Sequence, residues 1–245
     1  MAIRFSATPE GYRAFDASVT KSGMKFTKPM IDGYLTGIEQ HPYYDKMAAV
    51  KKFSMLHVDV LLLLRLFARS VRGGILEIGP YIGGSSIAIG SGVRDGGGSP
   101  FVSIEHGGVG EELGGIYSQH PHIPSSDILG DLRRNLEAEG LSNFVTLIEG
   151  KSDASAVVQA VHEAHKQTRI DLLFIDADGA IDRDLASYRS LLSPGALLVF
   201  DDYAATGAQG KELMVRAQVD AAVRVGRFES FGVYGWGTWV GRLLS

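Results

Sequence analysis

The chain has 245 residues, of which 45% are hydrophobic, and its formal net charge is −4 at neutral pH. This length and composition suit one α/β domain with a large core, while the acidic balance gives no basic stripe for nucleic acid and the absence of cysteine excludes disulfides and thiolate metal sites. Residues 1–6 lack a signal-peptide core and the longest apolar run, 60–64, is far too short to cross a bilayer, so we expect a soluble cytoplasmic protein without a membrane partner.

The first part of the chain is predicted to be helical. Residues 1–45 contain several aromatic residues and glycines, lack the alternation of strands and are too apolar for disorder, so we interpret them as an N-terminal cap of short helices. In residues 46–69 the apolar positions fill more than one helical face. That pattern predicts one long, largely buried helix.

From Gly74 onward, short apolar runs alternate with helical segments, which indicates a mostly parallel sheet covered on both faces. The last two runs are joined by Tyr-Gly-Trp-Gly and are expected to form an antiparallel hairpin at one edge. The sequence therefore predicts an α/β fold with a doubly wound, mostly parallel seven-stranded sheet. The predicted strands are 75–78, 101–105, 145–149, 172–176, 196–201, 227–233 and 238–243.

Acidic residues stand at the ends of the first five predicted strands. In a doubly wound sheet, ligands bind outside the carboxyl ends of the strands, so we expect these acids to surround one crevice. Each of them could instead cap a helix or face water. The strand-end acids are Glu77, Glu105, Glu149, Asp176, Asp201 and Asp202.

The strongest local signal is the run Ile-Leu-Glu-Ile-Gly-Pro-Tyr-Ile-Gly-Gly-Ser at residues 75–85, where an apolar strand breaks into a glycine turn before a helix of small residues. Glycine permits positive φ and close approach of a ligand, and the helix start offers free N–H groups. The spacing of Gly79, Gly83 and Gly84 differs from the dinucleotide fingerprint. Glycine-rich corners are common in α/β proteins, so this signal alone leaves the ligand open.

With Glu77 and Tyr81 included, the pattern Glu-x-Gly-x-Tyr-x-Gly-x-Ser resembles the first motif of class I S-adenosylmethionine-dependent methyltransferases, of the catechol and caffeoyl-coenzyme A O-methyltransferase type. The resemblance implies a Rossmann-like fold, a methyltransferase domain over residues 46–245, a small-molecule acceptor and S-adenosylmethionine as cofactor, with S-adenosylhomocysteine as product. A homodimer is compatible with it. The cofactor-binding residues that it implies are Glu77, Gly79, Tyr81, Gly83, Ser85, Glu105, Ser152 and Asp176.

For two of these residues, the position in the sequence gives a further reason to expect a role in binding the cofactor. Glu105 ends the second predicted strand about 20 residues past the glycine turn, where a carboxylate can accept both ribose hydroxyls. Ser152 follows the third strand, where the resembled family contacts the adenine, although a serine there could equally cap the helix that begins near Ala154.

Asp176, Asp201 and Asp202 form a second group, from Phe-Ile-Asp-Ala-Asp and Val-Phe-Asp-Asp-Tyr. Three hard oxygen donors from neighbouring strand ends suit Mg²⁺ with open positions for water and substrate, and without a cation they would repel one another. We therefore predict a magnesium site. The alternative is an ordinary acidic loop without metal, continued by Asp178, Asp182 and Asp184.

The resembled catechol-type enzymes have a lysine general base three residues after the first metal aspartate, and here that position is Gly179. We expect Asp176, Asp202 and His106 to be the catalytic residues, with Asp178, His106 and Asp202 as candidate bases. The Asp-Asp-Tyr sequence also resembles bacterial O-methyltransferases of secondary metabolism. The acceptor pocket is expected to involve the long loop 106–126, the N-terminal aromatic residues and Trp236, although core packing would equally explain those aromatics.

These features predict an O-methyltransferase that uses S-adenosylmethionine and Mg²⁺ to methylate a hydroxyl of a small aromatic or glycosidic metabolite. The alternatives are a metal-free N-methyltransferase of a heterocycle, in which the missing lysine costs little, and a non-catalytic S-adenosylmethionine-binding protein. A dehydrogenase fits less well, because the dinucleotide glycine spacing is absent.

Overall fold

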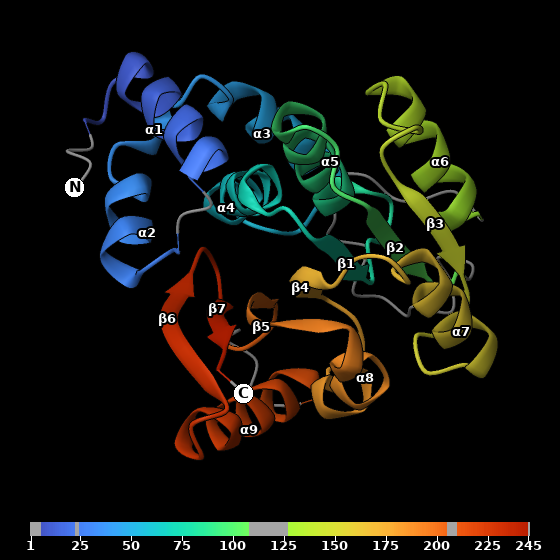
Figure 1. Ribbon diagram of the computed structural model, residues 1–245. Helices are drawn as coiled ribbons and strands as arrows, with labels where there is room; N and C mark the ends of the chain where they lie inside the picture. Colours follow the sequence, from blue (N-terminus) through green and yellow to red (C-terminus); the bar gives the residue numbers. More distant parts are fainter. Residues whose placement is uncertain (1–5, 23–24, 108–126, 205–209, 245) are drawn as a thin grey trace.

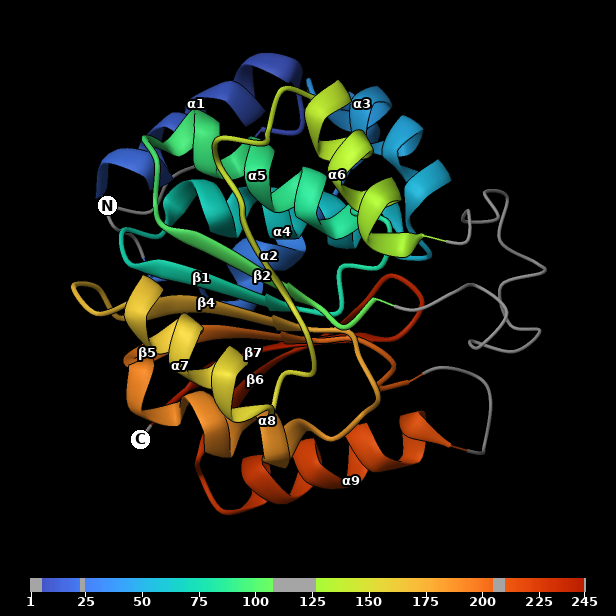
Figure 2. The same ribbon diagram turned by 90° about the vertical axis from the view of Figure 1, so that its right-hand side faces the viewer.

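The computed structural model describes residues 6–22, 25–107, 127–204 and 210–244. In this part of the chain, seven strands form one sheet in the order β3-β2-β1-β4-β5-β7-β6, with helices on both faces (Figures 1 and 2). Strands β1 to β5 run parallel, and β7 pairs antiparallel with β5 and β6, which confirms the predicted fold class. The strands are β1 (Gly74–Ile78), β2 (Phe101–Glu105), β3 (Thr146–Glu149), β4 (Ile170–Ile175), β5 (Leu192–Phe200), β6 (Phe228–Tyr234) and β7 (Thr238–Leu243).

The helices lie in two layers, one on each face of the sheet (Figure 2). One layer contains α1 (Pro9–Ser22), α2 (Lys28–Leu35), α3 (Tyr44–Val50), α4 (Val58–Ser70), α5 (Gly84–Gly96) and α6 (Ile128–Ala138). The other contains α7 (Ser155–Ala164), α8 (Ile181–Tyr188) and α9 (Lys211–Arg224). None of the helices among the described residues combines the length and apolarity that a membrane span needs.

Alternation along the central strands divides the core between these two layers. Ile75 and Leu172 pack on the side of α4 and α5, whereas their neighbours Leu76 and Leu173 pack on the side of α8 and α9. Because successive side chains of a strand point to opposite faces, a strand that is covered on both sides is apolar throughout. The central strands therefore read as continuous apolar runs in the sequence.

The predicted long helix over residues 46–69 is wrong, because the chain breaks between α3 and α4. Ser54 is extended, with φ −146° and ψ 144°, and its Oγ accepts the N–H of Leu56. His57 then caps α4 through its Nδ1, which accepts the N–H of Asp59 at 3.3 Å. The break leaves Met55 half exposed and places it beside the cavity described below.

The N-terminal helices share a core with the rest of the chain. Arg65 of α4 is completely buried and donates from Nη1 to Asp16 of α1 at 3.0 Å and from Nη2 to Asp95 of α5 at 2.7 Å. Asp95 also accepts the hydroxyl of Tyr43, and the Arg65 guanidinium lies 3.5 Å from the centre of that tyrosine ring. This ion cluster joins α1, α4 and α5.

The strand order changes direction between β1 and β4, since β2 and β3 continue on one side and β5 on the other. Ligands of open α/β sheets bind at such a switch point, beyond the carboxyl ends of the strands. Backbone hydrogen bonds hold these ends together: Gly79 donates to Ile104, and Asp176 donates to Ile78. The residues that follow β1, β2 and β4 are therefore neighbours in space.

Candidate functional site

A cavity of about 460 Å³ opens at this switch point, beyond the ends of β1, β2 and β4. Apolar side chains such as Met55, Ile104 and Ile128 form part of its wall. Six of the residues predicted to bind a cofactor or to act in catalysis also line it. They are Gly79, Tyr81, Glu105, His106, Ser152 and Asp176.

The glycine corner and Glu105 meet directly on one side of this cavity. Glu105 is buried at the end of β2, and its Oε2 accepts the backbone N–H of Tyr81 at 3.0 Å while Oε1 accepts that of Gly107 at 2.9 Å. Burial raises the pKa of Glu105, although these N–H groups favour its ionised form. Both oxygens keep a lone pair for hydroxyl groups of a ligand.

Two residues of the site have a backbone conformation that favours glycine. Tyr81, with φ 55°, and Asp202, with φ 59°, are the non-glycine residues of positive φ in the described part of the chain. A bulky residue in this region is strained, and such strain persists only where the surrounding structure holds it. Tyr81 is held by its N–H bond to Glu105, and Asp202 by its ion pair with Lys211.

Three residues of the predicted cofactor set lie outside the wall of the cavity. Glu77 is completely buried within β1, where it accepts hydrogen bonds from Ser86 at 2.5 Å and Ser103 at 2.7 Å, and burial raises its pKa. Gly83 precedes α5, and Ser85 is buried in the first turn of that helix. These residues support the corner from behind, whereas Gly79 and Tyr81 face the open space.

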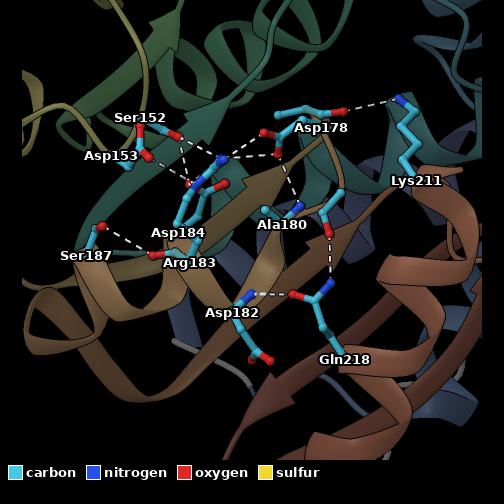
Figure 3. A network of polar contacts seen from close by, with 12 residues as sticks. Ser152, Asp153, Asp178, Ala180, Asp182, Arg183, Asp184, Ser187, Lys211 and Gln218 are labelled. Atoms are coloured by element: carbon cyan, nitrogen blue, oxygen red, sulfur yellow. Dashed lines mark hydrogen bonds and ion pairs between the residues drawn. The ribbon is translucent and has the colours of Figure 1, made fainter.

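Ser152 is held by a charged network on the far wall of the cavity (Figure 3). Its Oγ donates to Asp184 at 2.7 Å and accepts from Nη2 of Arg183 at 3.3 Å. Arg183 also binds Asp178 at 2.6 Å. Because the hydroxyl proton of Ser152 is committed to Asp184, the oxygen presents only acceptor capacity to a ligand.

The three predicted metal ligands come together. One carboxylate oxygen from each of Asp176, Asp201 and Asp202 lies within 4.8 Å of the other two. Burial, followed by the charge of Asp201, raises the pKa of Asp176 well above its usual range, and burial with the charge of Asp202 raises that of Asp201. Three carboxylates this close together fit a divalent cation, which would relieve their repulsion.

Lys211, which the sequence reasoning missed, lies beside this cluster. Its Nζ is 2.5 Å from Oδ2 of Asp202 and 3.6 Å from Oδ1 of Asp176, and it lines the cavity. Burial acts to lower the pKa of Lys211, but the charges of Asp176 and Asp202 raise it overall, so the amine keeps its proton. No local motif marks this lysine, because it starts a helix far along the chain from Asp176.

The candidate bases differ in their surroundings. Burial acts to raise the pKa of Asp178, but hydrogen bonds from Arg183 and from the N–H of Ala180 lower it overall, which makes Asp178 a poor proton acceptor. His106 follows β2 directly, is exposed and lines the cavity. Asp202 is paired with Lys211.

Several expectations from the sequence differ from the structure or fall outside its described residues. The expectation that all strand-end acids surround one crevice is wrong for Glu77, which is buried within β1. It is also wrong for Glu149, whose side chain is 63% exposed on the edge strand β3 beside Arg133. The N-terminal aromatics Tyr12, Phe15 and Tyr34 belong to the core. Trp236 is exposed and packs on His57. Most of the long loop that was expected to contribute to the acceptor pocket, residues 108–126, lies outside the described residues.

Comparisons with known proteins give a consistent result. A family model described as a methyltransferase domain matches residues 76–203, which include most of the residues that line the cavity and all three acids of the cluster. No curated protein matches this chain in sequence.

Solved structures share the fold. The O-methyltransferase TomG from Streptomyces achromogenes, involved in tomaymycin synthesis and solved with SAM, is 18% identical, with 83% of this chain and 90% of that chain covered and a TM-score of 0.57. An O-methyltransferase from Bacillus cereus in complex with SAH is 19% identical, with 96% and 99% covered and a TM-score of 0.53. A methyltransferase from Geobacter sulfurreducens is 22% identical, with 89% and 96% covered and a TM-score of 0.55. At these identities the likeness concerns the fold.

Proposed function

This chain belongs to the methyltransferase-domain family, as a class I S-adenosylmethionine-dependent methyltransferase, and we propose that it methylates a hydroxyl group of a small aromatic or glycosidic metabolite with the help of Mg²⁺. The observation that carries this proposal is that Asp176 belongs both to the wall of the cofactor cavity and to the three-carboxylate cluster. The donor and a metal-bound acceptor would thus meet at one side chain.

The residues of the cavity suit the parts of S-adenosylmethionine. Glu105, whose oxygens are fixed by the N–H groups of Tyr81 and Gly107, would accept the ribose hydroxyls. Ser152, whose oxygen can only accept further hydrogen bonds, would accept one from the exocyclic amine of the adenine. Gly79 lines the cavity, and its lack of a Cβ lets this corner pack directly on the backbone of Asp176 at the end of β4.

Methyl transfer from a sulfonium is a displacement in line, so its rate depends on holding the acceptor at attack distance and on making it nucleophilic. Mg²⁺, when bound, supplies a Lewis acid that lowers the pKa of a coordinated hydroxyl. Asp176, Asp201 and Asp202 would hold it. Of the candidate bases, His106 would take the acceptor proton, since Asp178 is engaged with Arg183 and Asp202 with Lys211. Met55 would cover the site from the loop before α4.

An assay for S-adenosylhomocysteine release tests this function. The purified chain is incubated with S-adenosylmethionine, Mg²⁺ and separate panels of vicinal-hydroxyl aromatics, glycosides and heterocyclic amines. We expect turnover with a hydroxyl acceptor that EDTA abolishes and added Mg²⁺ restores. The metal-free N-methyltransferase is the second candidate, because Lys211 already supplies the acid cluster with a cation. Turnover of an amine that persists in EDTA would favour this candidate.

Replacing Glu105 by Ala is expected to weaken S-adenosylmethionine binding by about 1.5–3 kcal/mol, because hydrogen bonds to a charged group are lost. Isothermal titration calorimetry measures this change. Glu149→Ala is the matched control: Glu149 pairs with Glu105 in register on the neighbouring strand but is exposed away from the cavity. Equal affinities of wild type and Glu105→Ala would remove Glu105 from the ribose site.

A further inference from the structure

The side chain of Lys211 reaches from the first residue of α9 to the ends of two strands. Besides its contacts with Asp202 and Asp176, its Nζ donates to the carbonyl oxygen of Ala177 at 3.3 Å. The acceptors thus come from the ends of β4 and β5. They hold the ammonium against two of the three carboxylates that are proposed to bind Mg²⁺.

The approach of Lys211 depends on Gly179. This glycine has φ +85°, and a Cβ on it would lie 2.8 Å from Cβ of Lys211 and 3.0 Å from the Lys211 carbonyl oxygen. The carbonyl oxygen of Gly179 accepts a hydrogen bond at 2.8 Å from Nε2 of Gln218, which also belongs to α9. A side chain at position 179 would therefore push the start of α9 away from the acid cluster.

The absence of a side chain at Gly179 and the position of Lys211 are linked. The position that carries a lysine in the resembled family has no side chain here, and the space above it is taken by a lysine from another helix. Since the contact is made by packed backbone at both ends, the place of this ammonium is set by the fold.

We propose that Lys211 is an internal counter-ion of the metal site, which neutralises the Asp176–Asp201–Asp202 cluster in the metal-free protein and has to give up its carboxylate contacts when a divalent cation binds. This inference rests on the Mg²⁺ dependence proposed above. Two cations held by the same carboxylates repel each other, so each binds at the expense of the other. Lys211 would thereby set the metal concentration at which the enzyme becomes active. At lower metal concentrations, its charge would reduce the repulsion among the three carboxylates.

Metal titration of a Lys211→Met variant tests this proposal without relying on activity. The free Mn²⁺ signal in electron paramagnetic resonance gives the affinity of the full-length protein, and competition with Mg²⁺ extends the result to that ion. We expect Lys211→Met to bind Mn²⁺ at least about tenfold more tightly than wild type, because the competing charge is gone. Lys211→Gln, which keeps a hydrogen-bond donor but no charge, is expected to change in the same direction and serves if the methionine variant does not fold.

Thermal unfolding provides a second readout. In EDTA, Lys211→Met should melt below wild type, because three crowded carboxylates are left without a cation. Saturating Mg²⁺ should then raise its melting temperature by more than it raises that of wild type. Lys166→Met, at an exposed pair with Glu163 on α7, is the matched control and should alter neither quantity.

The outcomes separate this inference from the proposed function. Mn²⁺ binding by wild type with no tighter binding by either uncharged variant would refute the role of Lys211 and leave the metal site in place. No Mn²⁺ binding by wild type or variants would refute the metal dependence itself, and the inference with it. Tighter binding by both uncharged variants, with Lys211→Arg close to wild type, would support the competition of charges.

Discussion

A Gly79→Val variant is expected to lose measurable S-adenosylmethionine binding and to unfold at a lower temperature than wild type. Gly79 has φ +85°, and a Cβ on it would lie 2.1 Å from the carbonyl oxygen of Asp176 and 2.8 Å from its carbonyl carbon. These atoms belong to the backbone at the end of β4 and cannot turn aside. A β-branched residue at positive φ is also strained, so we expect the free energy of unfolding to fall by about 3 kcal/mol or more.

Cofactor affinity by calorimetry and thermal unfolding by circular dichroism measure the two effects. Gly140→Ala is a suitable control, because Gly140 also has positive φ, at +65°, but nothing lies within 4 Å of an added Cβ. The control should lose about 1 kcal/mol of stability and keep its cofactor affinity. If Gly79→Val bound the cofactor like wild type, the nucleoside would have to lie away from the corner between β1 and β4.

Asp176→Asn is expected to slow methyl transfer by about a hundredfold or more, equivalent to roughly 2.7 kcal/mol of barrier. Asparagine keeps the shape of the side chain but removes one of the three charges that would hold Mg²⁺. The metal concentration for half-maximal rate should rise as well. Asp182→Asn, on the exposed start of α8 beside Arg227, is the control that should retain both values.

The same variant has an expected effect on stability in EDTA. Because burial and the charge of Asp201 raise the pKa of Asp176, its protonated form is favoured in the folded state. The stabilising contribution is therefore complete below the ordinary pKa of about 3.9 and is lost as the pH rises through the raised pKa. At neutral pH the metal-free Asp176→Asn protein should melt above wild type, and the difference should vanish at low pH. A lower melting temperature at neutral pH would contradict the repulsion within the cluster, whereas an unchanged metal response would remove Asp176 from the metal site.

The sequence alone could predict the sheet, because its central strands are apolar runs between glycines and the antiparallel pair is joined by Tyr-Gly-Trp-Gly. It could not predict the break before α4, since Met55 and Leu56 continue the apolar pattern of a helix. The reason for the break lies elsewhere in the chain: a Cβ on Gly84 would touch Ser54 and the carbonyl of Phe53, so the start of α5 packs directly on this turn.

The site divides in the same way. The closeness of Gly79, Tyr81 and Glu105 follows from the spacing along the first two strands and could be predicted. The burial of Glu77 inside the protein could not be predicted, because a strand that is buried on both faces shows no alternation of polar and apolar residues in the sequence. Lys211 could not be found either, since its contact with Asp176 requires β4 and β5 to be neighbours and Gly179 to leave the space.

The Arg65 cluster has a consequence for any shortened form of this enzyme. A chain that starts after α1 would lack Asp16, so the Arg65 guanidinium, which is buried in the full chain, would lose the carboxylate partner of its Nη1. Removing one partner of a buried ion pair costs about 3–5 kcal/mol, a large share of the stability of an ordinary domain. Trimming the N-terminal helices would thus weaken the helix layer that contains α4 and α5, and α5 begins at the glycine corner after β1.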